Sequence, residues 1–151
     1  MMKASMDGTN AVEIVSRSLS GLSDPMGVAI DHWSLKLYWA DFDIAKIQSS
    51  TLDGQDVQTI VDLPSGIPLL GLAMDEDLIY FSDWDMRSST LMSCNKTGGD
   101  MRILCNSSAP IQQPTVVTAV PPPTTRSNDC AGQSCSGICV LMPASFRCLS
   151  V

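Results

Sequence analysis

The sequence has few basic residues, few aromatic residues, one histidine and no long apolar segment, and each shortage excludes a class of function. Nine lysine and arginine residues against 16 acidic residues give a net charge of −7, which argues against nucleic acid as a partner. The longest apolar run, 66–74, is far shorter than the ~18 residues that a membrane-spanning helix requires. The N-terminal segment MMKASMDGTN lacks the apolar core of a signal peptide. The single histidine, His32, has no nucleophile motif near it, which argues against a Ser/His/Asp triad.

Four of the six cysteines lie close together near the C-terminus. Cys130, Cys135, Cys139 and Cys148 have the uneven spacing C-x4-C-x3-C-x8-C. This spacing favours a disulfide framework over zinc, which usually takes a close pair of cysteines and a second pair further along the chain. Disulfides require an oxidising compartment, to which a signal peptide normally delivers a protein. We therefore expect this sequence to be a fragment of a longer secreted or membrane-anchored protein.

Two long segments of the sequence repeat with a period of roughly 44 residues. GVAIDHWSLKLYWAD (27–41) matches GLAMDEDLIYFSD (71–83), and STLDGQDVQTIV (50–61) matches NKTGGDMRILC (95–105). A third tail, ASMDGTNAVEIV (4–15), stands at the front, and PTVVTAV (114–120) echoes the head of the repeat near the end. Repeats of this length, built of short strands, indicate the blades of a β-propeller.

Each repeat is expected to form four strands. In the first complete copy they span 26–31, 37–41, 46–52 and 57–61. The Asp53-Gly54 pair between the last two strands is a strong hairpin signal, because a type I′ turn needs positive φ at both central residues. The segments 6–8 and 97–99 occupy the same place in the other copies.

The repeated residues resemble a known family. Tyr38-Trp39-Ala40-Asp41 and Tyr80-Phe81-Ser82-Asp83 are similar to the YWTD motif of the low-density-lipoprotein (LDL) receptor class B repeats. The flanking P-x-G-(V/L)-A-(I/M)-D pattern is similar too, and NDCAGQSCSGICVLMPASFRC (128–148) resembles the start of the EGF-like module that follows such repeats. The sequence departs from the motif at three positions, with alanine and serine in place of Thr and phenylalanine in place of Trp. It also has Ser150 where a fifth cysteine of the module is expected.

The resemblance implies an all-β fold, a partial six-bladed YWTD β-propeller with about two to three blades and a truncated, disulfide-bonded EGF-like module at the C-terminus. We expect propeller blades over 1–120, divided into the end of one blade (1–21), two further blades (22–62 and 63–108) and the first strand of the next (109–120). A Pro/Thr connector is expected at 121–127 and the EGF-like module at 128–151. Because so few blades cannot close a ring, exposed strand edges should leave the free chain marginally stable or prone to aggregation.

The resemblance also implies a function, that of an extracellular protein-ligand-binding segment of an LDL-receptor-related endocytic or signalling receptor, without catalysis. In the family, the loop after the YWTD strand and the residue after the repeat's proline face the top of the propeller, where peptide ligands dock. Those positions are Met26, Asp43, Leu69 and Asp85. They would suit a peptide or protein with basic and aliphatic side chains. The alternative, loop charges that only solvate a rim, stays open.

A second class of function is a nidogen-like structural protein of the extracellular matrix, which carries similar blades and EGF-like modules. A transmembrane helix downstream would favour the receptor at the outer side of the plasma membrane, and its absence would favour the secreted matrix protein. The resemblance implies the remaining blades of a full-length receptor as further partners, and no membrane segment in this stretch. No cofactor and no metal ion are expected. An enzyme would need an acidic metal-binding cluster at the channel, where the inner strands are mainly apolar.

The motif residues themselves are expected to be structural. Adjacent strand residues point to opposite faces, so the aromatic pairs 38–39 and 80–81 should fill the space between blades rather than form a ligand-stacking box. Asp41 and Asp83 end their strands, and their carboxylates should accept backbone N–H bonds at the corner.

The remaining cysteines and two sequons complete the candidate sites. Cys94 and Cys105 flank a hairpin and could form a cross-strand disulfide, or remain as two buried free thiols. Asn95-Lys96-Thr97 and Asn106-Ser107-Ser108 are candidate N-glycosylation sites.

Within the EGF-like module, the family's pairing implies the disulfides Cys130–Cys139 and Cys135–Cys148. Sequence alone permits three pairings of four cysteines. Calcium-binding modules carry Asp four residues before the first cysteine, where this sequence has Arg126, so no calcium site is expected.

Overall fold

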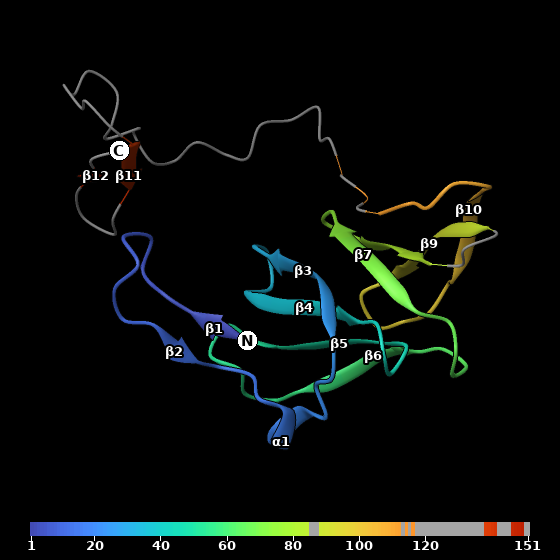
Figure 1. The fold of residues 1–151 in the computed structure, drawn as a ribbon, viewed down its shortest axis with the longest axis horizontal. Helices are drawn as coiled ribbons and strands as arrows, with labels where there is room; N and C mark the ends of the chain where they lie inside the picture. Colours follow the sequence, from blue (N-terminus) through green and yellow to red (C-terminus); the bar gives the residue numbers. More distant parts are fainter. Residues whose placement is uncertain (85–87, 113, 115, 117–137, 142–145, 150–151) are drawn as a thin grey trace. The chain divides into compact units, whose positions relative to one another are not determined.

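The structure is a computed structural model that describes residues 1–84, 88–112, 114, 116, 138–141 and 146–149. The chain divides into two compact units, 14–117 in one and 1–13 with 118–151 in the other. The larger unit contains two four-stranded antiparallel sheets (Figure 1). The first sheet consists of β3 (Pro25–Asp31), β4 (Lys36–Asp41), β5 (Lys46–Thr51) and β6 (Gln58–Asp62). The second consists of β7 (Leu69–Met74), β8 (Leu78–Asp83), β9 (Ser89–Asn95) and β10 (Arg102–Ser107).

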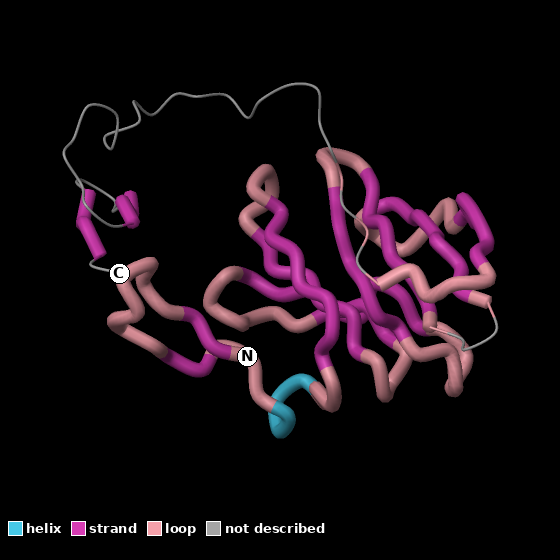
Figure 2. The backbone as a smooth tube through the Cα atoms, turned by 45° about the horizontal axis from the view of Figure 1, so that its top comes forward, coloured by secondary structure: helices cyan, strands magenta, loops and turns pink. Residues whose placement is uncertain are grey.

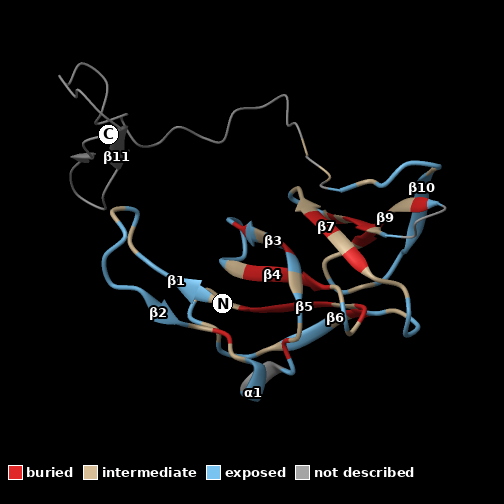
Figure 3. Ribbon diagram, in the orientation of Figure 1, coloured by how far each residue is buried: buried red, intermediate tan, exposed pale blue. Residues whose placement is uncertain are grey.

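In each sheet the strands lie side by side in chain order, so each repeat folds as one meander. The strands agree with the sequence prediction within two residues at each end. The short segments rich in β-branched and aromatic residues form them because such side chains pack well on a pleated surface. The second strand, β4, is buried on both faces from Leu37 to Asp41 (Figure 3), as expected for a strand with a neighbour on each side and protein above and below.

The outer hairpins differ from the expected turn type. Gly54 has positive φ (77°) but Asp53 does not. The turn is therefore not type I′, which needs positive φ at both central residues. Instead the Gly54 N–H donates to the Thr51 carbonyl (3.0 Å) and the Thr51 N–H donates to the Gln55 carbonyl (2.9 Å). This is the longer hairpin loop in which a turn is followed by a left-handed glycine. The prediction of a hairpin was therefore correct in place and wrong in turn type.

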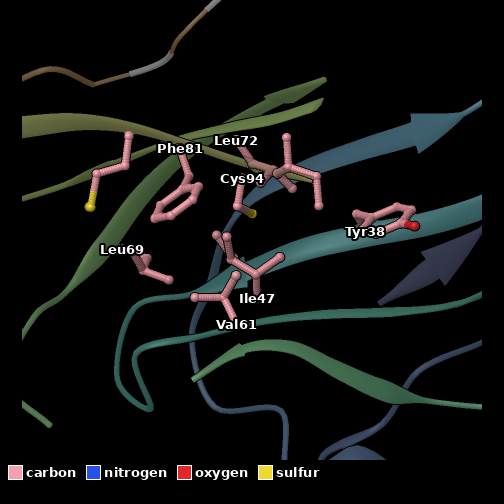
Figure 4. Close-up of a cluster of buried hydrophobic side chains, with 10 residues drawn as sticks. Tyr38, Ile47, Val61, Leu69, Leu72, Phe81 and Cys94 are labelled. Atoms are coloured by element: carbon pink, nitrogen blue, oxygen red, sulfur yellow. The ribbon is translucent and has the colours of Figure 1, made fainter. Parts of the chain in front are cut away.

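The core of the larger unit lies between the two sheets. Its buried side chains come from both sheets: Tyr38, Ala40, Ile47, Val61, Leu69, Leu72, Ile79, Phe81, Met92 and Cys94. Figure 4 shows Leu69, Phe81, Ile47 and Val61 turned toward one another. Burial of each large apolar side chain contributes about 1.5–3 kcal/mol, so this cluster supplies the main force that holds one sheet on the other.

The first strands of the two sheets approach most closely at a glycine. A Cβ atom on Gly27 would stand 2.8 Å from both the Cβ and the backbone nitrogen of Leu72. Only glycine leaves room for β3 and β7 to pack at this distance. The repeated glycine of the sequence pattern is therefore a packing residue.

The remaining elements are short (Figure 2). β1 (Met2–Lys3) pairs with β2 (Val12–Glu13), and α1 (Arg17–Ser20) is a single helical turn that ends at Gly21, whose φ is 67°. Near the C-terminus β11 (Ile138–Leu141) pairs with β12 (Phe146–Leu149). The prediction of an all-β fold is confirmed apart from this one helical turn. The Pro/Thr connector 121–127 lies outside the described residues, and the domain boundaries stay a prediction.

Candidate ligand-binding site

The aromatic motif residues belong to the core rather than to a site. Tyr38 is 2% exposed, and Trp39 and Phe81 are fully buried. The indole nitrogen of Trp39 donates to Oε1 of Gln48 on the neighbouring strand (3.2 Å), which satisfies its only polar group. The fourth aromatic, Tyr80, is half-buried and its hydroxyl donates to Asp75 (2.8 Å). Three of the four motif aromatics are therefore buried side chains.

The aspartates that end the motif strands fix the loops that follow. Asp41 is fully buried, and its carboxylate accepts the backbone N–H groups of Ser23 (2.7 Å), Asp24 (3.1 Å), Asp43 (3.2 Å) and Ile44 (3.4 Å). Four donors around one carboxylate satisfy its charge without any cation. This confirms the expected role of Asp41.

Asp83 makes a different contact in the second sheet, since its Oδ1 accepts the backbone N–H of Thr90 (2.5 Å). The contact joins the end of β8 to β9, the strand that pairs with it. Asp83 therefore joins two strands, whereas Asp41 holds the loop after its strand.

The residues after the two aspartates are held in the same way in both repeats. The Phe42 N–H donates to the Asp24 carbonyl, and the Trp84 N–H donates to the Pro68 carbonyl, each at 2.8 Å. The two rings meet edge to face with centroids 5.9 Å apart. This geometry is favourable for aromatic pairs. A pair of aromatic rings from adjacent repeats therefore stands at one end of the two sheets.

A cavity of about 430 Å³ adjoins this aromatic pair. Its lining residues are Met26, Leu70, Trp84, Pro110 and Gln112. The lining is mainly apolar with one amide, and the volume lies within the ~300–1,000 Å³ range of small-molecule and side-chain pockets. Met26 is 49% exposed and Trp84 40% exposed, so both are accessible. This cavity is the candidate ligand-binding site.

Two of the lining residues are placed by β-bulges. The β3–β4 register skips from Pro25 to Gly27, and the β7–β8 register skips from Leu69 to Gly71. Met26 and Leu70 are the residues left out of the two ladders. A bulge re-aims the side chain of its extra residue, which explains why both turn into the cavity.

The bulge in β7 also shows that the prediction of one site residue was wrong. Leu69 was expected at the ligand-binding surface because it follows a proline, but it is fully buried in the core. Alignment on the repeated glycine makes Leu70 the equivalent of Met26, and Leu70 lines the cavity. In a strand a shift of one residue moves a side chain to the other face, so the prediction was wrong by one position.

The predicted acidic residues lie outside the cavity lining or outside the described residues. Asp43 is exposed, and its carboxylate accepts the Ser23 hydroxyl (2.8 Å), which in turn accepts a bond from the Arg17 guanidinium (2.9 Å). Asp43 therefore belongs to a small polar network and does not line the cavity. Asp85 falls outside the described residues.

Sequence reasoning placed Met26 at the site but missed Leu70, Pro110 and Gln112. Trp84 was not among the predicted ligand-binding residues either. Leu70 could have been found by aligning the repeats on their glycines rather than on the proline. Pro110 and Gln112 lie beyond the last motif and carry no repeat signal, so only the folded chain brings them to the cavity.

The structure has no disulfide between Cys94 and Cys105, since both are free thiols. The register pairs Cys105 with Leu91, three residues along β9 from Cys94. Cys94 instead lies in the core, where burial raises the pKa of its thiol to about 11, and Cys105 is exposed. The alternative of two buried thiols is therefore correct for one of them.

The other cysteines and the sequons stay predictions. In the C-terminal hairpin the backbone register places Cys139 opposite Cys148, while Cys130 and Cys135 lie outside the described residues. Asn95 uses its side chain in the hairpin, since Oδ1 accepts the N–H groups of Thr97 (3.0 Å) and Gly99 (2.8 Å). Asn106 is exposed on β10.

The described residues contain neither a candidate metal-binding cluster nor a candidate membrane-spanning helix. Within the described residues, no group of three or more His, Cys, Asp or Glu side chains is arranged to hold a metal ion. In that same part of the chain, no helix has the length and apolar character needed to span a membrane.

The relatives found by comparison with known proteins agree with the family that the motifs resemble. No protein-family model matches the chain. The chain is 32% identical over 148 residues to the vitellogenin receptor Yl of Drosophila melanogaster, covering 92% of this chain and 7% of that protein. It is also 32% identical over 154 residues to low-density lipoprotein receptor-related protein 5 of Mus musculus, covering 98% of this chain and 9% of that protein. The chain is homologous to a segment of these receptors.

The homologous segment is a small part of its relatives, since the chain spans less than a tenth of the length of the curated receptors it matches. A vitellogenin receptor of Solenopsis invicta is 32% identical over 140 residues. A solved chain from a crystal structure of a nidogen/laminin complex superposes with a TM-score of 0.62 at 24% identity, over 70% of this chain and 39% of that one. That likeness supports the fold, two four-stranded sheets of the propeller-blade type.

Proposed function

We propose that this receptor-homologous segment is part of the extracellular ligand-binding region of an LDL-receptor-related receptor, and that it binds protein or peptide ligands without catalysis. One observation carries the proposal: a largely apolar cavity is built at equivalent positions of two repeats, by Met26, Leu70 and Trp84. Two bulge residues at equivalent positions of the two repeats line this cavity, which supports a role in binding because neither is needed in the core.

The lining suggests the class of ligand. An aliphatic side chain of a protein ligand would enter between Met26, Leu70 and Trp84, and the Gln112 amide would hydrogen-bond to its backbone. The net charge of −7 and the exposed Asp43 favour a ligand with basic residues near the aliphatic one. The nidogen-like matrix function has only a likeness of fold behind it.

The test is a binding measurement on the secreted 151-residue chain. Purified vitellogenin is the first probe, because two of the relatives are named as its receptors, and a displayed library of short peptides is the second. We expect Trp84→Ala to weaken binding by about tenfold or more, since aromatic side chains in a pocket carry much of the energy of an interface.

Trp33→Ala is the matched control, because Trp33 is also an exposed tryptophan (58%) but lies at the opposite end of β3 from Met26. Its effect on affinity should stay within about twofold. Equal loss of affinity in both variants would place binding elsewhere. Failure of both probes to bind a folded chain would contradict the proposed function.

A further inference from the structure

The same backbone contact joins successive repeats at two places. A Cβ atom on Gly54 would stand 1.7 Å from the carbonyl oxygen of Ile14, and a Cβ on Gly98 would stand 1.9 Å from that of Ile60. In each case the glycine of an outer hairpin receives a carbonyl from the end of the preceding repeat: Ile60 lies in β6, and Ile14 directly follows β2. The oxygen therefore occupies the place of a side chain, and contacts the Cα–H of the glycine.

The receiving carbonyl belongs to a β-bulge. Val61 pairs with Ile47 and Thr59 with Gln48, so Ile60 is left out of the ladder between β5 and β6. A bulge frees the backbone groups of its extra residue from the ladder and turns them aside. This explains how the Ile60 carbonyl becomes available to a glycine from the next repeat.

The last strand of the second sheet has the same bulge. Ile103 pairs with Met92 and Cys105 with Leu91, which leaves Leu104 out of the ladder at the position equivalent to Ile60. Leu104 is 48% exposed, and Cys105, the equivalent of Val61, is exposed as well, whereas Val61 is 3% exposed. β10 thus repeats the receiving half of the contact, and its residues from Arg102 to Asn106 are exposed.

A third hairpin repeats the inserting half. In residues 5–9 the Gly8 N–H donates to the Ser5 carbonyl (2.9 Å) and the Ser5 N–H donates to the Thr9 carbonyl (2.8 Å). The hairpins of Gly54 and Gly98 have the same two hydrogen bonds, and all three have a second positive φ two residues later, at Asn10, Asp56 and Asp100. No atom lies within 4 Å of a Cβ placed on Gly8.

We propose that this chain associates with a second copy of itself, with the Gly8 hairpin of one copy seated on the Leu104 bulge of the other. The occupant is a second copy because the chain carries both halves of a joint that it already uses twice. The exposed side chains of Met6 (71%) and Ile103 (66%) supply apolar surface around the contact. The two surfaces differ, so the association is head to tail and grows with concentration. It rests on the joint between repeats and is independent of the ligand cavity.

The experiment is sedimentation velocity over a roughly hundredfold range of concentration, without any ligand. All proteins carry Cys105→Ser, which removes the exposed thiol as a source of cross-links. The starting chain should increase in mean mass with concentration. Gly8→Val should weaken the association by about tenfold or more, because a side chain would occupy the place of the carbonyl oxygen. Gly66→Val is the matched control, since Gly66 also has positive φ (93°) and open space.

Mixing gives the sharper test. Ile103→Lys alters an exposed residue of β10 and should block the receiving surface while leaving the hairpin intact. Gly8→Val and Ile103→Lys should each associate only weakly alone, but their mixture should form a 1:1 complex that grows no further, because each retains one half of the joint. A monomer at every concentration, equal association of the Gly8 and Gly66 variants, or a mixture that stays monomeric would overturn the proposal. A monomeric chain that still binds vitellogenin would leave the proposed function intact.

Discussion

At the scale of single residues, the third position of the motif differs between the two repeats: it is serine in the second sheet and alanine in the first. Gly71 and Ser82 are paired across β7 and β8, and the buried Gly71 N–H donates to the Ser82 hydroxyl (3.2 Å). In the first sheet the same pair is Gly27 and Ala40, which has no hydroxyl. The hydroxyl thus satisfies a donor beside the bulge that places Leu70. The residue that replaces Thr at this position therefore decides whether this hydrogen bond can form.

Removing the Ser82 hydroxyl should destabilise the second sheet. We expect Ser82→Ala to lower the free energy of unfolding by about 1–2 kcal/mol, because it removes a buried hydrogen bond. Urea denaturation followed by tryptophan fluorescence measures the change. Ser49→Ala is the matched control, since Ser49 is equally buried and its hydroxyl has no hydrogen-bond partner. Equal costs at the two serines would show that the Ser82 hydrogen bond contributes nothing.

At the scale of the elements, each outer hairpin has two roles that one glycine combines. The left-handed φ of Gly98 (85°) closes the turn, and its missing side chain admits the Ile60 carbonyl. The first role is local and is visible in the sequence as a repeated turn signal. The second depends on the bulge in a strand of the other sheet, and only packing shows it.

The two roles can be separated by substitution. Gly98→Ala should lower the free energy of unfolding by more than about 2 kcal/mol, since it adds a clash with backbone to the cost of a left-handed alanine. Gly66→Ala should lose only the conformational part, about 1 kcal/mol, because nothing lies within 4 Å of its Cβ position. Both are measured by urea denaturation. A Gly98 variant no less stable than the Gly66 variant would mean that the inter-repeat contact can relax without cost.

At the scale of the whole molecule, one ion pair complements the apolar core between the two sheets. Asp31 at the end of β3 is fully buried, and Lys96 from the hairpin of the second sheet reaches it at 2.8 Å. The ammonium of Lys96 also lies 5.2 Å from the ring centroid of Trp33. Burial by itself would raise the pKa of Asp31, but the hydrogen bonds from Lys96, Ser34 and Trp33 outweigh it and lower the pKa from 3.8 to about 2.

This ion pair should make stability depend on pH in the acid range. Because the pKa of Asp31 is lower in the folded state, its contribution is complete above about pH 4 and is lost as the pH falls toward 2. We expect Lys96→Gln to lower the free energy of unfolding by about 2 kcal/mol at pH 7, and the difference from the parent chain to shrink at pH 2 as Asp31 becomes protonated. Urea denaturation at the two pH values measures this.

The control is Lys46→Gln, since Lys46 and Asp62 form a solvent-exposed pair at 3.1 Å. That variant should change stability by less than about 1 kcal/mol. A Lys96 effect of the same size at pH 7 and pH 2 would show that the charge of Asp31 is not its cause.

Much of the fold follows from the sequence by itself. The strands, the hairpins, the buried motif aromatics and the loop-binding role of Asp41 could be predicted because each depends on dihedral preferences and on side-chain alternation over a few residues. The receptor homology could be recognised because those local patterns recur in order.

Only the tertiary structure decided that Leu70 rather than Leu69 faces the cavity, that Pro110 and Gln112 complete it, and that Cys94 and Cys105 are apart. It alone joined Asp31 to Lys96 and the hairpin glycines to the bulge carbonyls. These contacts link residues far apart in the chain, and a single bulge, which no local pattern reveals, changes which side chains and carbonyls can meet.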